Sequence, residues 1–207
     1  VSTYHCDNGI FTSKSWTDAL HDQSQRQSLS GVGVHHQNAH AERAIGTVTS
    51  SARAMLLHLQ IHWPDKYDTK LWPFALSYAA WIYNHTPKLN GLAPIKLFCG
   101  THTSCDYLRR ARVFGCPVYV LDPRLQDGKK IPKWEPRACR GQFLGFSPIH
   151  SSTIGLIRNV NTDFVSPQFH FVADQRFETV PGGLQDRTIT DITPDSLHLF
   201  LRSRWDS

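Results

Sequence analysis

The chain has 207 residues, of which 40% are hydrophobic, and its formal net charge is +5. This length suffices for one large domain or two small ones with packed cores, and the positive charge favours a polyanionic partner. The five cysteines are scattered without a Cys-x-x-Cys pair, which argues against a disulfide framework or a cysteine-rich zinc site and favours a reducing compartment. No apolar run reaches membrane-spanning length, and the first residues do not read as a signal peptide.

The first forty residues predict strands, a turn and a short helix. Residues 1–6 read as a strand, and Asp7-Asn8-Gly9 is a turn signal. Residues 11–20 predict a short helix capped by Thr12 or Ser13. A short strand and a glycine- and serine-rich loop follow in residues 28–34. Because the chain opens inside a strand and without methionine, we expect it to be a fragment of a longer product.

Three helices are predicted next. From residue 41, apolar residues recur at helical spacing and predict a core-facing stripe that Pro64 closes; they are Ile45, Val48, Ala52, Met55, Leu56 and Leu59. Residues 72–83 are apolar on nearly every face, so this helix is either buried or awaits a partner surface. Residues 93–98 predict one more short helix before Gly100.

From Val113 onward the pattern changes to short strands. Strands are predicted at residues 117–121, 141–146, 153–160 and 164–172, with turn signals at Asp122-Pro123, Asp127-Gly128 and Asn161-Thr162-Asp163. Four or five short strands at this spacing indicate a small β-barrel or meander. Residues 181–207 are polar and predict a linker or tail.

Two acids are candidate metal ligands. Asp7 lies where a strand meets a glycine turn, and Glu42 lies in the first turn of the long predicted helix. Each has an ordinary explanation, because Asp-Asn-Gly is a common turn and an acid at a helix start favours the helix dipole. Together they are compatible with a shared divalent cation, which phosphoryl transfer on nucleic acid requires.

A strongly basic stretch occupies residues 108–140. Nine basic residues and three acids give it a net charge of +6; the basic residues are Arg109, Arg110, Arg112, Arg124, Lys129, Lys130, Lys133, Arg137 and Arg140. Basic residues interleaved with aromatic ones suit sequence-independent binding to a phosphate backbone, and a solvated basic face is the alternative. We expect the neighbouring Tyr119, Phe143 and Trp134 to be barrel core rather than stacking surfaces.

Ordered motifs resemble the integrase region of copia-type (Pseudoviridae-like) LTR retrotransposon Gag-Pol polyproteins. Cys6-Asp7-Asn8-Gly9 and His36-Gln37-Asn38-Ala39-His40-Ala41-Glu42-Arg43 are similar to two acidic motifs of that family. Further similar segments follow in order within residues 4–180: Ala54-Met55-Leu56, the tryptophan-rich helix of residues 71–87, the segments 93–100 and 113–120, and Gly141-Gln142-Phe143-Leu144-Gly145-Phe146-Ser147.

The resemblance implies an α/β chain. Residues 1–107 would be the later part of a ribonuclease-H-like integrase catalytic core with a helical extension. Residues 108–180 would be a small basic barrel of the Src-homology-3 type, and residues 181–207 a linker. Asp7 and Glu42 would be the second and third acids of an Asp-Asp-Glu site for Mg²⁺ or Mn²⁺. The first acid would lie upstream of Val1, so we expect this chain alone to be inactive.

Several departures from the family pattern affect the predicted site. The turn after Asp7 is one residue shorter than in the family, Cys6 stands in a serine position, and Ala39-His40 replaces Gly-Val before the glutamate. Ala44-Ile45-Gly46 replaces a stretch of the Lys-Asn-Arg kind, which removes two cations that would face DNA.

The expected parent activity is DNA integration by metal-dependent strand transfer. The expected partners are DNA, the missing N-terminal half of the core, and further copies of the parent; the expected location is the nucleus and cytoplasmic particles. DNA contacts are predicted at Gln37, Asn38, Arg43, Arg109, Arg110, Arg112, Lys129, Lys130, Lys133, Arg137 and Arg140. The alternatives are a catalytically dead DNA-binding remnant and a packing or oligomerisation module that uses the apolar helix at Trp72.

Overall fold

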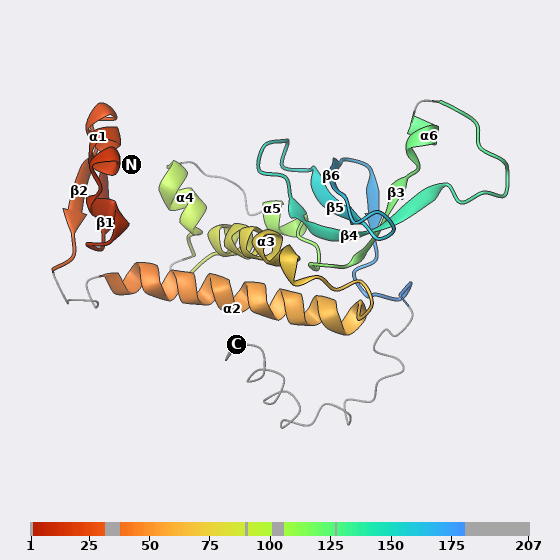
Figure 1. The fold of residues 1–207 in the computed structure, drawn as a ribbon, viewed down its shortest axis with the longest axis horizontal. Coiled ribbons are helices and arrows are strands. Elements are labelled where there is room, and N and C mark those ends of the chain that lie inside the picture. The colour runs from red at the N-terminus through yellow and green to blue at the C-terminus, as the bar shows by residue number, and fades with distance from the viewer. Residues whose placement is uncertain (1, 32–37, 90, 101–105, 127, 181–207) are drawn as a thin grey trace, which may run out of the picture. The chain divides into compact units, whose positions relative to one another are not determined.

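The computed structural model describes residues 2–31, 38–89, 91–100, 106–126 and 128–180 (Figure 1). The chain divides into two compact units. The first contains Val1–Ala54 and Trp72–Ala111, and the second contains Met55–Leu71 and Arg112–Ser207. The predicted linker of residues 181–207 lies outside the described residues. The protein is a mixed α/β chain that includes a small antiparallel β domain, and the two units are described in turn.

The first unit opens with a strand–helix–strand arrangement. Strands β1 (Thr3–Cys6) and β2 (Arg26–Leu29) pair in parallel. Parallel neighbours need a crossover connection, which η1 (Ile10–Thr12) and α1 (Lys14–Asp22) supply. Trp16 of α1 packs edge-on against Tyr4 and Phe11, with ring centroids 5.7 and 5.4 Å apart. The predicted strand and helix are confirmed, whereas a ribonuclease-H-like core stays a prediction.

The predicted helices of the first unit are also confirmed. Helix α3 (Trp72–His85) follows η3 (Thr69–Leu71), and α4 (Pro94–Cys99) and α5 (Asp106–Arg109) come next. Helix α4 ends on Gly100 at a left-handed φ of 64°, the backbone conformation that favours glycine at a helix end. Trp72 at the start of α3 is 58% exposed, so this helix is not covered on every side.

Helix α2 (Ala39–His62) is the longest helix described, and its residues belong to both units. Its apolar stripe is core-facing only in part. Ala52 and Leu59 are buried, whereas Ile45 is 66% exposed. The prediction of a core-facing stripe is therefore right for the later turns and wrong at Ile45.

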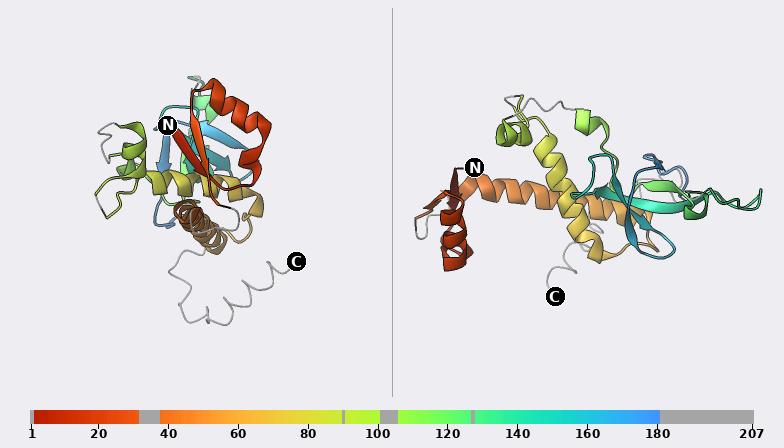
Figure 2. Two further views of the ribbon diagram at one scale, coloured as in Figure 1. Left: turned by 90° about the vertical axis from the view of Figure 1, so that its left-hand side faces the viewer. Right: turned by 90° about the horizontal axis from the view of Figure 1, so that it is seen from above.

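The second unit is built on a five-stranded antiparallel sheet. Its strands are β3 (Pro117–Leu121), β4 (Ala138–Phe146), β5 (Gly155–Asn159), β6 (Val165–Gln168) and β7 (Phe171–Ala173), in the order β6-β5-β4-β3-β7. The two edge strands, β6 and β7, are separated in the chain only by Phe169 and His170. The sheet must therefore curl until its edges approach, as Figure 2 shows. This confirms the small β domain that the sequence predicts.

The core of the second unit is formed by the sheet and by the end of α2. Val118, Phe143 and Ile157 are each at most 3% exposed, and Leu59 and Trp63 are 0% and 4% exposed. Burying apolar side chains of this size contributes about 1.5–3 kcal/mol each. The last turns of α2 are therefore part of the core of the β domain.

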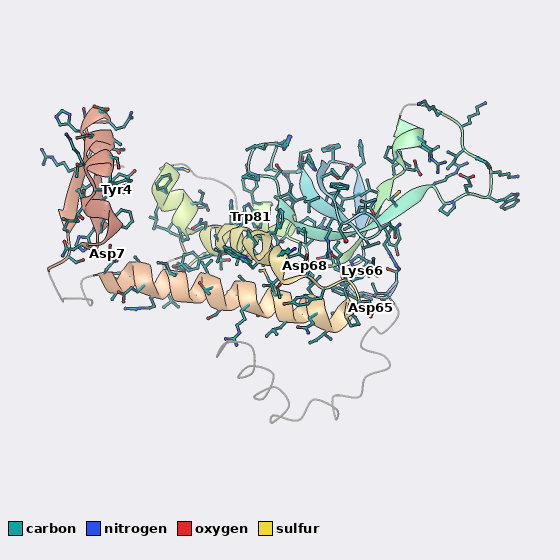
Figure 3. The ribbon with its side chains drawn as sticks, in the orientation of Figure 1. Tyr4, Asp7, Asp65, Lys66, Asp68 and Trp81 are labelled. Atoms are coloured by element: carbon teal, nitrogen blue, oxygen red, sulfur yellow. The ribbon has the colours of Figure 1, made fainter. Side chains whose placement is uncertain are left out.

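Arg158 of β5 connects the segment between α2 and α3 to the sheet through a hydrogen bond. Its guanidinium is 7% exposed and donates to the backbone carbonyl of Lys66 at 2.7 Å and to Oε1 of Gln142 at 3.1 Å. It also forms an ion pair with Asp163 at 2.8 Å. Lys66 is labelled in Figure 3. A buried cation is stable only when it is paired and hydrogen-bonded, and Arg158 meets both conditions.

The segment after β7 folds back onto α2. Phe177, at a left-handed φ of 59°, stacks on His62 with ring centroids 3.9 Å apart and meets His58 edge-on at 5.1 Å. The turn is held by Asp174, whose Oδ2 accepts hydrogen bonds from the backbone N–H and the hydroxyl of Thr179, both at 2.8 Å. Burial lowers the pKa of His58.

None of the described helices combines the length and apolar character needed to cross a bilayer.

Candidate nucleic-acid interface

The two predicted metal ligands lie at element ends, as the sequence indicates. Asp7 follows β1 and is exposed (Figure 3), and its Oδ1 accepts a hydrogen bond from the backbone N–H of Gly9 at 3.3 Å. Glu42 lies in the first turn of α2 and is also exposed. These are the settings of a turn acid and a helix-start acid.

The described residues do not by themselves fit a divalent metal centre. Across the described ranges, no three His, Cys, Asp or Glu side chains lie together in a group that could hold a metal ion. Mg²⁺ takes carboxylate and other oxygen ligands in a near-octahedral arrangement. A shared Mg²⁺ or Mn²⁺ site at Asp7 and Glu42 therefore stays a prediction, and we derive no chemical step from it.

Two of the three DNA contacts predicted near Glu42 lie in the described residues. Arg43 is exposed in the first turns of α2, and Asn38 lies immediately before that helix and is half-buried. Gln37, also predicted to contact DNA, lies outside the described residues. The role of these three residues in DNA binding stays a prediction.

The basic residues of the second unit gather on the connection between β3 and β4. We call residues 122–137 the β3–β4 loop; it contains the short helix α6 (Pro123–Gln126) and extends away from the sheet (Figure 1). Its base is closed by a hydrogen bond from the Asp122 N–H to the Arg137 carbonyl at 2.9 Å. Asp122 also caps α6, because its Oδ1 accepts from the Arg124 N–H at 2.9 Å.

Arg124 links the two described acids of this loop. Its guanidinium forms ion pairs with Asp122 at 3.0 Å and with Glu135 at 3.3 Å. Hydrogen bonds donated by Arg124 lower the pKa of the Asp122 carboxyl. The hydrogen bond to Asp122 and the negative charge of that carboxylate in turn raise the pKa of the Arg124 guanidinium. Arg124 is therefore an internal partner of both carboxylates.

The remaining basic residues are placed as follows. Lys129, Lys130, Lys133 and Arg137 are exposed on the β3–β4 loop. Arg140, on β4 just beyond the loop, is exposed, and its guanidinium carbon lies 5.5 Å from the ring centroid of Trp63. Arg112 precedes β3 and is half-buried, whereas Arg109 and Arg110 lie in α5 and in the residue after it, in the first unit.

The structure corrects the prediction for one of the three aromatic residues. Phe143 is fully buried and Tyr119 is half-buried, but Trp134 is 89% exposed. Trp134 lies between Pro132 and Pro136, in a segment that cannot form a regular ladder because proline lacks the backbone donor. These two prolines were the signal in the sequence that separates Trp134 from the core residues.

Comparison with known proteins gives little further information. No family profile matches the chain, and no curated protein matches it. A solved structure with some likeness is described as the cryo-EM structure of a simian T-cell lymphotropic virus intasome in complex with the PP2A regulatory subunit B56 gamma. The TM-score is 0.36 at 16% identity, and the match covers 90% of this chain and 59% of the other. At this level the likeness carries no functional argument.

Proposed function

We propose that this chain is an integrase-related protein whose small β domain binds the phosphate backbone of DNA without regard to sequence. The observation that carries the proposal is the charge arrangement on the β3–β4 loop. Lys129, Lys130, Lys133 and Arg137 are exposed there, while Arg124 occupies the neighbouring carboxylates of Asp122 and Glu135. A cationic projection of this kind attracts a polyanion and releases its counterions on binding.

The copia-type motifs around Asp7 and Glu42 support the relation to integrases. We propose strand transfer only for a polypeptide that also supplies the first acid of the family site, with Mg²⁺ or Mn²⁺ as its cofactor. Binding of DNA is therefore the function proposed for this chain itself. Assembly with further copies and action in the nucleus belong to the same proposal.

The test is a titration of fluorescently labelled duplexes at two salt concentrations. Replacing Lys129, Lys130 and Lys133 with alanine should weaken all duplexes alike and flatten the salt slope by about 0.9 for each phosphate that the variant no longer neutralises. A matched control replaces Lys14, Lys70 and Lys96, which lie outside the loop, and so changes the net charge equally. If both triple variants bind alike, the loop is only a solvated basic surface.

A second function has a specific observation in its favour. Trp72 is 58% exposed, and Leu97 and Phe98 of α4 are 62% and 71% exposed, all within the first unit. Large exposed apolar side chains often mark association surfaces. A packing or oligomerisation role for this unit is therefore the second candidate function. Replacing Trp72, Leu97 and Phe98 with serine would then reduce the mass measured by light scattering. If the measured mass is unchanged, that role is excluded.

A further inference from the structure

Among the described residues of the β domain, a highly exposed aromatic ring lies beside a cation. Trp134 is 89% exposed. The ammonium of Lys133 lies 5.3 Å from its ring centroid. An indole left in water forgoes the favourable burial that tryptophan normally gains. Such a residue therefore contributes little to the fold and is available to a ligand.

Trp134 is held at the tip of an anchored turn. The Glu135 N–H donates to the Pro132 carbonyl at 3.1 Å, which closes a turn with Lys133 and Trp134 at its two central positions. The same Glu135 is tied through Arg124 to Asp122 at the base of the loop. The indole is thus presented by a hydrogen-bonded turn that an ion pair links to the base of the loop, and such preorganisation lowers the entropy cost of binding.

The surroundings of the ring specify the chemistry of its ligand. Trp134 offers a flat π surface, and Lys129, Lys130, Lys133 and Arg137 of the same loop offer positive charge. A ligand that satisfies both carries a planar apolar group linked to an anion, as a nucleotide does. In a duplex the faces of the bases are covered by their neighbours, so only an unpaired base can stack on a side chain.

We infer that Trp134 is a stacking surface for an unpaired base, so that the β3–β4 loop takes single-stranded nucleic acid or a frayed DNA end in preference to intact duplex. This inference rests on the proposed DNA binding of the same loop. An anionic membrane surface would also attract a tryptophan among lysines. Membrane insertion relies on several apolar side chains on one face, whereas Trp134 is the one large exposed hydrophobic residue among the described residues 128–137.

The experiment compares three ligands of equal length: a single-stranded oligonucleotide, a single strand whose sugars lack bases, and a duplex. Trp134→Ala should weaken binding of the base-bearing single strand by roughly 5- to 100-fold. It should leave the base-free strand and the duplex nearly unchanged, and Trp134→Phe should recover most of the missing affinity. Because Trp134 is exposed, both variants should have the same thermal midpoint of unfolding as the parent. Circular dichroism measures this midpoint.

The outcomes separate this inference from the proposed function. If the triple-lysine variant weakens all three ligands and Trp134→Ala weakens none, the loop binds backbone alone and the stacking inference is wrong. If none of the ligands binds the parent chain, both proposals fail. If Trp134→Ala instead abolishes binding to vesicles of anionic phospholipid and leaves oligonucleotide binding intact, the surface serves a membrane and the inference is overturned.

Discussion

The indole N–H of Trp63 donates a hydrogen bond to the backbone carbonyl of Gly115 at 2.8 Å, and both residues are buried in the β domain. Gly115 also lies against Leu59, whose Cδ1 occupies the space that a Cβ at this position would need. Gly115 also has a φ of 76°. A glycine is therefore required here both by the backbone conformation and by the close approach of α2.

Gly115→Ala should destabilise the second unit by about 2–5 kcal/mol, because a left-handed φ costs about 1–2 kcal/mol and overpacking costs about 1–3 kcal/mol. Urea unfolding followed by tryptophan fluorescence measures this change. The matched control is Gly128→Ala in the same unit, which has a φ of 72° and nothing within 4 Å of its added Cβ. Gly128→Ala should lose only the part of the unfolding free energy that comes from the left-handed backbone. Equal losses in the two variants would contradict the packing of Leu59 on Gly115.

Arg158→Met should also destabilise the second unit, by about 2–4 kcal/mol. The substitution leaves Oε1 of the buried Gln142 without this donor, and an unsatisfied buried acceptor costs about 1–3 kcal/mol. The missing hydrogen bond to the Lys66 carbonyl, which is only partly buried, adds about 0.5–1.5 kcal/mol. The missing ion pair with Asp163 adds little, because Asp163 is 60% exposed. Arg176→Met is the control, since the Arg176–Glu178 pair is 86% and 63% exposed; its midpoint in urea should not move. A loss of similar size there would show that charge removal, rather than burial, causes the effect.

The second unit should lose stability in mild acid through His58. Burial lowers the pKa of His58 below its ordinary value of 6.5, so the unfolded chain binds the proton more readily than the folded chain. Stability is then constant above pH 6.5 and falls as the pH drops from 6.5 towards the lowered pKa.

The measurement for this prediction is the thermal midpoint between pH 8 and pH 5. His58→Gln should flatten the profile, whereas His170→Gln, at an exposed position in the same unit, should leave the slope of the parent. A parent profile that is flat below pH 6.5 would show that burial does not keep water from the imidazole of His58.

Asp7→Asn and Glu42→Gln should leave DNA affinity undiminished. Both side chains are exposed acids, and each substitution removes a negative charge that opposes DNA. Titration of a labelled duplex measures this directly. A marked loss of affinity in either variant would place that side chain in the duplex interface rather than in a metal site, and Mn²⁺ titration by electron paramagnetic resonance tests the metal site separately.

Local patterns predict the elements of this chain well. Proline and glycine near the ends of α3 and α4 indicate these helices, and a run of β-branched and aromatic residues after Pro117 indicates a strand, close to where they are found. The exposure of individual side chains is harder to predict. Ile45 lies in a regular helical pattern, but burial depends on what covers a face, and a single segment does not contain that information.

The sequence predicts the positive charge of the candidate interface but not which of its basic residues form internal ion pairs. The cluster from Arg112 to Arg140 is evident from composition alone. The pairing of Arg124 with both Asp122 and Glu135 is not, because it depends on the path of the loop between them. The presentation of Trp134 by the Pro132–Glu135 turn depends on the same path. Sequence reasoning therefore finds the positive patch and misses which cation is structural.

The order of strands in the β domain has a consequence for synthesis on the ribosome. Strands β3 to β6 pair with their neighbours as they emerge, but the outer edge of β3 is covered only by β7, through Val118 opposite Ala173. Until residue 173 has left the exit tunnel, the nascent sheet carries an unpaired edge that can recruit other strands. Translation past β7 therefore replaces the five-residue edge of β3 with the three-residue edge of β7, and a short edge recruits other strands less readily.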